Sequence, residues 1–186
     1  MLYVALVHAP VYNKNMETIT SSITNLDIHD IARCAATYGA RSYYIVHPSP
    51  AQQELTRRIM GFWQEGIGAT YNPDRREAFV RVKLAADLAE VRDEIHRELG
   101  DGERKVYQVA TDARLYPNTV DYADLRARME KGDDAYLLVF GTGSGIVSEE
   151  IRRSDYILRP IYGPGTYNHL SVRSAAAIIL DRLCGR

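Results

Sequence analysis

The sequence contains few cysteines and no cluster of metal-ligating residues around them. Cys34 and Cys184 are the only two cysteines in 186 residues, and neither belongs to a Cys-x-x-Cys or a Cys/His motif. Structural zinc sites need several such ligands at characteristic spacings, so no metal site is expected. Two distant thiols without a disulfide framework are typical of a cytoplasmic protein.

The chain also lacks long apolar runs and a strong charge of either sign. A membrane-spanning helix needs about 20 apolar residues, and no segment approaches that length. The first ten residues, MLYVALVHAP, have no basic region before their short apolar run, so they do not resemble a targeting signal. A formal net charge of −1 gives no support to wholesale nucleic-acid binding, although it leaves room for a local basic patch.

What the chain does contain is a regular alternation of apolar strands and amphipathic helices. Strands are predicted at 2–7, 42–47, 78–84, 105–111, 135–141 and 155–161, and helices at 26–40, 51–66, 85–99, 121–131, 148–154 and 170–183. No repeat or linker divides the chain, so residues 1–186 are expected to form one domain. The alternation predicts an α/β fold with a mainly parallel sheet and helices on both faces.

A glycine-rich stretch, LLVFGTGSGIVSEE (137–150), follows the most apolar predicted strand. It lacks the Lys-Ser/Thr of a P-loop, and Ile146 stands where the dinucleotide motif has its third glycine. It resembles the first motif of Rossmann-type methyltransferases, but that motif follows the first strand of its sheet. Two interpretations of the glycines remain: a tight turn that needs positive φ, or a close backbone approach to a ligand.

Two further stretches place polar residues where α/β sheets bind ligands, near the carboxyl ends of strands. The predicted helix 26–40 carries His29 and Arg33 on one face, which indicates either a solvated surface or an arginine at the rim of a cleft. The last helix follows GPGTYNHL, where Asn168 or Ser171 is the best helix-capping candidate. His169 is harder to explain as a cap.

Together these stretches resemble the SPOUT superfamily of S-adenosylmethionine-dependent RNA methyltransferases. PVYNK, TNLDIHDIAR, YNP, FGTG and NHLSVRSA occur in the order found in a small bacterial family of that superfamily, which also occurs fused to tRNA guanine-N1 methyltransferases. The ribose-methylating branch has Asn-x-Gly-Ala-Ile-x-Arg in its first motif. Here Asp27, His29 and Asp30 depart from that pattern, whereas Ile31 and Arg33 match it.

The resemblance implies a C-terminal trefoil knot, which is a rare exception to normal chain connectivity. It also implies a homodimer with the active site near the subunit interface, S-adenosylmethionine as cofactor and RNA as partner, with tRNA favoured through the fused relatives. The acceptor would be a ribose 2′-hydroxyl or a base nitrogen. No metal is needed, because the sulfonium methyl group is already activated and the protein's task is alignment.

The resemblance also suggests roles for individual residues. Arg33 is the first candidate to engage the acceptor, and the other catalytic candidates are His29, His169 and Asn168, with either histidine as proton acceptor. The expected cofactor-binding residues are Val139, Phe140, Gly141, Thr142, Gly143, Pro160, Ile161, Tyr162, Gly163, Asn168, His169, Leu170 and Ser171. The expected RNA contacts are Lys14, Arg41 and Arg173.

Two other functions fit the same residues. A Rossmann-type methyltransferase would use the same cofactor, but its glycine loop must follow the first strand. A non-catalytic RNA- or nucleotide-binding module on the same scaffold would bind the cofactor without methylating RNA.

Overall fold

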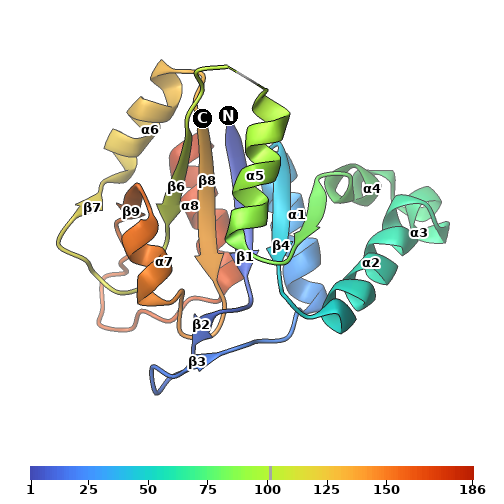
Figure 1. Ribbon diagram of the computed structural model, residues 1–186, viewed down its shortest axis with the longest axis horizontal. Coiled ribbons are helices and arrows are strands. Elements are labelled where there is room, and N and C mark those ends of the chain that lie inside the picture. Colours follow the sequence, from blue (N-terminus) through green and yellow to red (C-terminus); the bar gives the residue numbers. More distant parts are fainter. Residues whose placement is uncertain (101) are drawn as a thin grey trace.

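The computed structural model describes residues 1–100 and 102–186, and these residues form a seven-stranded parallel sheet (Figure 1). The strand order is β5-β4-β1-β8-β6-β9-β7, and every neighbouring pair runs parallel. The strands are β1 (Leu2–Val7), β4 (Ser42–Val46), β5 (Val82–Ala85), β6 (Val106–Ala110), β7 (Thr119–Val120), β8 (Ala135–Gly141) and β9 (Tyr156–Leu158). A short antiparallel hairpin pairs β2 (Val11–Tyr12) with β3 (Thr18–Ile19).

Helices cover both faces of this sheet. They are α1 (Asn25–Thr37), α2 (Pro50–Gln64), α3 (Ile67–Tyr71), α4 (Pro73–Phe79), α5 (Leu88–Leu99), α6 (Tyr122–Lys131), α7 (Ser148–Arg153) and α8 (Val172–Cys184). Figure 1 shows α5 and α7 in front of the sheet and α1 and α8 behind it. The predicted α/β fold with a mainly parallel sheet is therefore confirmed.

The two faces bury separate hydrophobic cores because successive strand residues point to opposite sides. On β1, Val4 and Leu6 pack with the α1 and α8 side, whereas Ala5 and Val7 pack with the α5 and α7 side. The apolar stripe predicted on the helix 26–40, which includes Ile31, is fully buried in the first core. Gly39 ends that helix with a φ of 71°, as its predicted place at the helix end requires.

The structure corrects two of the predicted strands. Residues 78–84 were expected to be one strand, but Ala78 and Phe79 belong to α4, because Asn72 caps that helix and Phe79 is fully buried. The strand predicted at 155–161 ends at Leu158. Pro160 has no N–H to donate to a neighbouring strand, so pairing cannot continue past it.

The carboxyl ends of the parallel strands meet at one edge of the sheet, and the segment after β1 folds across that edge. Tyr12 N donates to Gly145 O at 2.9 Å, and Ser144 N donates to Tyr12 O at 2.7 Å. The hairpin is therefore joined to the glycine loop that follows β8. Among the described helices, none is long and apolar enough to cross a bilayer.

Candidate functional site

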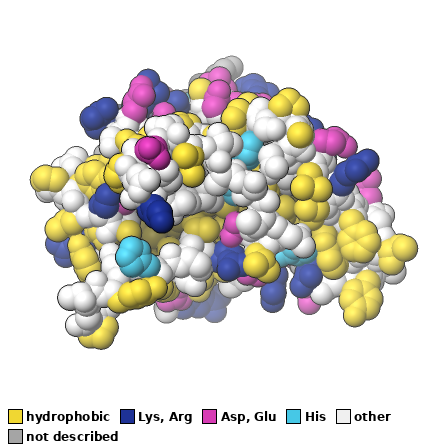
Figure 2. All heavy atoms as spheres, turned by 90° about the horizontal axis from the view of Figure 1, so that it is seen from below, with side chains coloured by type: hydrophobic (Ala, Val, Ile, Leu, Met, Phe, Trp, Pro, Cys, Tyr) yellow, Lys and Arg dark blue, Asp and Glu magenta, His cyan; other side chains and the backbone are white. Residues whose placement is uncertain are grey.

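A pocket of about 620 Å³ opens at the carboxyl edge of the sheet. Its walls come from the ends of β6 and β8, the segment before α8 and the first turns of α8 itself. Figure 2 looks onto this edge and shows a hollow with an apolar floor and cationic side chains at its rim. Pockets of roughly 300–1,000 Å³ are typical of small-molecule sites.

Most residues expected to bind the cofactor lie together in this pocket. The lining includes Phe140, Gly141, Thr142, Gly143, Pro160, Ile161, Asn168, His169, Leu170 and Ser171. Val139, Tyr162 and Gly163 do not line it. Val139 points to the opposite sheet face, into the core beneath α5, because it neighbours Phe140 on a strand. Tyr162 is 54% exposed and faces solvent.

The glycines of the loop are needed for contact with the protein's own chain. Gly143 and Gly145 have φ values of 61° and 100°, in the region that glycine adopts most readily. A Cβ atom on Gly143 would lie 2.6 Å from Tyr12 O, and one on Gly141 would lie 2.7 Å from Ile146 N. The tight-turn interpretation is therefore confirmed. The loop follows β8, so the Rossmann-type alternative, which needs it after the first strand, is wrong.

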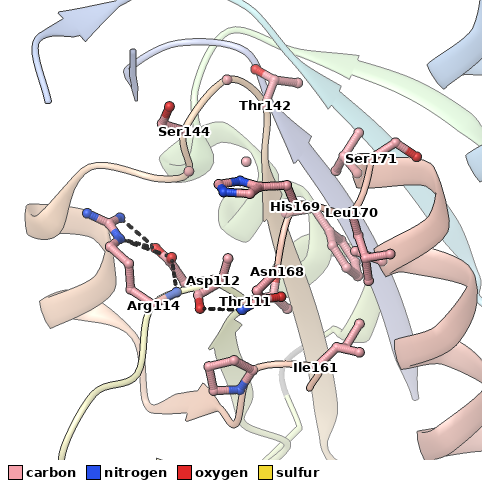
Figure 3. A pocket seen from close by; sticks show the side chains of 18 of the residues that line it. Thr111, Asp112, Arg114, Thr142, Ser144, Ile161, Asn168, His169, Leu170 and Ser171 are labelled. Carbon is pink, nitrogen blue, oxygen red and sulfur yellow. Dashed lines mark hydrogen bonds and ion pairs between the residues drawn. The ribbon is translucent and has the colours of Figure 1, made fainter. Parts of the chain in front are cut away.

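The two polar residues before α8 have different partners (Figure 3). Ser171 is the N-cap of α8, because its hydroxyl accepts from Ser174 N at 3.2 Å. Asn168 does not cap the helix: its Nδ2 donates to Ala113 O at 3.1 Å, which joins the last loop to the segment after β6. The His169 ring projects into the pocket and packs edge-on against Tyr167, with ring centroids 5.4 Å apart.

The polar residues of α1 separate into three environments. Asp27 is 9% exposed and lines the pocket, and Arg173 Nε lies 3.7 Å from its Oδ1. His29 lies outside the pocket, against Trp63 and Phe79, and burial there lowers its pKa. Arg33 is exposed and lines a neighbouring groove of about 580 Å³ between α1 and α8. The groove adjoins the pocket at Ser171.

The other predicted RNA contacts lie at opposite edges of the sheet. Lys14 is exposed in the hairpin loop at the pocket edge. Arg41 directly precedes β4 and so lies at the amino edge, where its Nη1 pairs with Glu98 Oε1 at 3.0 Å. Arg173 is engaged by two carboxylates, because its Nη1 also lies 3.7 Å from Asp30 Oδ2.

Sequence reasoning missed the segment after β6, where Asp112 and Arg114 line the pocket. The side chain of Asp112 is 2% exposed. Its Oδ2 accepts from Arg114 Nη2 at 2.6 Å, and its Oδ1 accepts from Arg114 Nε at 3.0 Å. The signal was present in the sequence, because ATDAR stands at the carboxyl end of a predicted strand, where α/β sheets bind ligands.

Thr142 is linked to a buried histidine behind the pocket wall. Its hydroxyl lies 2.5 Å from Ser21 Oγ, which lies 3.1 Å from His8 Nδ1. His8 is fully buried, and burial together with neighbouring His47 lowers its pKa to about 4. His8 is therefore neutral at physiological pH and supports the base of the glycine loop without carrying charge.

A family model described as "SAM-dependent RNA methyltransferase" matches residues 1–185. An "uncharacterized protein" of Aquifex aeolicus is 47% identical over 185 residues, covering 100% of this chain and 89% of that protein. A "tRNA (guanine-N(1)-)-methyltransferase" of Nitratidesulfovibrio vulgaris is 44% identical over 184 residues, covering 99% of this chain. The chain spans only 42% of that relative's length.

Solved structures share the fold at low sequence identity. TrmJ from Z. mobilis aligns over 99% of this chain and 69% of its own, with a TM-score of 0.63 and 13% identity. A TrmH/SpoU tRNA modifying enzyme of A. aeolicus aligns over 98% of this chain and 73% of its own, with a TM-score of 0.56 and 18% identity.

Substitution of Gly143 by alanine should destabilise the protein by about 2 kcal/mol or more, because it strains φ and drives Cβ against Tyr12 O. Urea unfolding measures the change. Gly163→Ala is the control, since no atom lies within 4 Å of its Cβ position, and it should shift the free energy of unfolding by at most about 1 kcal/mol. Equal effects of the two substitutions would contradict the packing role of Gly143.

Acid should weaken the fold through His8. Its pKa is about 4 in the folded chain and near 6.5 when unfolded, so the unfolded state gains a proton first as pH falls. The stability contributed by neutral His8 is complete above pH 6.5 and is lost between pH 6.5 and 4, by up to about 3 kcal/mol. Urea midpoints over this range should decline less in His8→Gln; parallel declines would exclude His8 as the group responsible.

Proposed function

Because the chain belongs to the family of SAM-dependent RNA methyltransferases, we propose that its acceptor is a tRNA, methylated in the cytoplasm at a ribose 2′-hydroxyl or a base nitrogen. The tRNA assignment is supported by the relative named as a tRNA methyltransferase, of which this chain matches less than half. The observation that carries the proposal is the pocket itself, in which two loops predicted from separate sequence motifs converge.

The residues of the pocket suit S-adenosylmethionine, which supplies a methyl group already activated on its sulfonium. Phe140, Ile161 and Leu170 give apolar surface for the adenine ring. We assign the polar edge of the adenine to backbone groups of Gly141, Ile161 and Leu170, which all line the pocket. Asp27 lines the pocket beside Arg173, and its carboxylate suits the positive end of the ligand, because an acidic group favours a nearby cation.

The acceptor side of the reaction is assigned to Arg33 and His169. His169 projects into the pocket, whereas His29 is enclosed by aromatic rings outside it, which favours His169 as the proton acceptor. Arginine stays protonated in proteins, so Arg33 orients the acceptor and stabilises developing charge. Asn168 is assigned a positioning role, because its amide holds the wall of the pocket against Ala113 O.

A homodimer would complete this site. Arg33 lines the groove between α1 and α8 and is absent from the lining of the pocket in its own chain. The groove adjoins the pocket at Ser171, so a second copy seated on α1 and α8 brings its Arg33 near the pocket. We further propose a C-terminal trefoil knot, in which the last segment is threaded through an earlier loop. The hydrogen bond from Asn168 to Ala113 O supports this, because it holds the segment before α8 against an earlier loop, the one that follows β6.

Labelled methyl transfer from S-adenosylmethionine to bulk tRNA tests the activity. Arg33→Ala should lower the transfer rate by about 100-fold or more, because charge stabilisation at the acceptor is lost. Its affinity for S-adenosylhomocysteine by calorimetry should stay within about twofold, since Arg33 lies outside the pocket. Arg57→Ala, a change on the surface of α2, is the matched control. Equal loss of affinity and transfer would assign Arg33 a structural role, and no labelling of any RNA would favour a binding module.

Mixing two inactive variants tests whether the site is shared between subunits. Leu170→Arg should block the pocket and remain folded, because Leu170 is 47% exposed. If Arg33 acts on the partner's pocket, a heterodimer of Arg33→Ala and Leu170→Arg contains one complete site, and transfer reappears after subunit exchange. Continued inactivity of verified heterodimers would place Arg33 and its pocket in one chain.

A further inference from the structure

Arg114 is held in place on one edge of its guanidinium. Nε and Nη2 donate to the carboxylate of Asp112, and Nη2 also donates to Ile146 O at 3.1 Å. The guanidinium carbon lies 5.4 Å from the ring centroid of Tyr12 and 5.9 Å from that of Tyr116, within the range of cation–π attraction. The side chain is therefore fixed before any ligand arrives.

The remaining nitrogen of the same guanidinium, Nη1, is free to bind a ligand. An arginine carries five N–H donors, and the contacts above use three. Within residues 1–100 and 102–186, the only acceptor found for Nη1 is the sulfur of Met16 at 3.8 Å. A thioether is a weak acceptor, so two strong donors stay without an oxygen partner. The side chain is 33% exposed, so these donors are within reach of solvent.

The position of this nitrogen favours the acceptor over the cofactor. Figure 3 shows the Asp112 carboxylate between the Arg114 guanidinium and the side chains of Asn168 and His169. Nη1 therefore lies at the outer rim, beside the hairpin loop that carries Met16. Lys14 is exposed in the same loop and has no ion pair among the described residues. The side chains of Arg114 and Lys14 therefore place two positive charges on one side of the pocket opening.

We propose that the Nη1 group of Arg114 binds a phosphodiester of the acceptor RNA and sets the position of the target nucleotide over the pocket. The two N–H groups of Nη1 carry part of the positive charge of the guanidinium and form strong hydrogen bonds to phosphate oxygens, and a fixed side chain loses little entropy when it binds. Phosphate contacts fix the register of a nucleic acid and carry no sequence information. This inference depends on the proposed function only in taking RNA as the acceptor.

The test measures binding of a fluorescein-labelled oligouridylate against salt, with S-adenosylhomocysteine at saturation. Loss of one phosphate contact lowers the slope of log affinity against log salt by about 0.7 for single strands. Arg114→Gln should show that decrease and bind about tenfold more weakly at low salt. Arg114→Lys should restore the slope. Arg97→Gln makes the same change in the last turn of α5, at the far edge of the sheet, and should leave the slope unaltered.

Three outcomes would overturn the inference. The first is an unchanged slope in Arg114→Gln, and the second is a wild type that fails to bind oligouridylate at low salt. The third is weaker binding of S-adenosylhomocysteine by Arg114→Gln with unaltered binding of methylthioadenosine, which lacks the carboxylate, because this would assign Arg114 to the cofactor. Methylation of tRNA by the wild type is scored separately, so a failure of the proposed function is distinguishable from each of these.

Discussion

The backbone pairing between Tyr12 and the glycine loop is the constraint on which the pocket depends. Tyr12 N and O bond to Gly145 O and Ser144 N, and this approach leaves no space for a side chain on Gly143. The pairing holds the tight turn after β8 in place, and Gly141 and Thr142 of this loop line the pocket. The first and last thirds of the chain therefore depend on each other for the shape of one wall.

Much of the fold could be predicted because the parallel strands are mostly apolar and the helices carry one buried stripe. Ile31, for example, was expected in the core and is fully buried. Phe79 could not be placed as easily. The alternating residues of AFVRVKL are typical of a strand, but Asn72 and Pro73 begin helix α4, and that helix runs as far as Phe79. The hairpin was also missed, since two-residue strands have no periodicity to detect.

Site residues in short local motifs could be predicted, whereas those brought together by tertiary packing could not. The resemblance to a known family pointed to ten lining residues, because the motifs that carry it, around the glycine loop and before α8, are short and local. His29 was a catalytic candidate and shares a helix face with Arg33, yet helical spacing does not say which neighbours that face meets. Trp63 and Phe79, brought in by α2 and α4, surround it instead. Arg114 gains its role only through tertiary contacts, which no local pattern reveals.

The wall formed by residues 160–170 makes few hydrogen bonds to the rest of the molecule, although Ile161 packs against the first core. In the part of the chain that the structure describes, the amide of Asn168 makes the one hydrogen bond found for this stretch. A ligand touching both walls must order these residues, and the conformational entropy lost offsets part of its contact energy. The more restricted the empty segment is, the less entropy a ligand would remove by ordering it. Pro160 and Pro164 narrow the backbone freedom of this segment and so lower that cost.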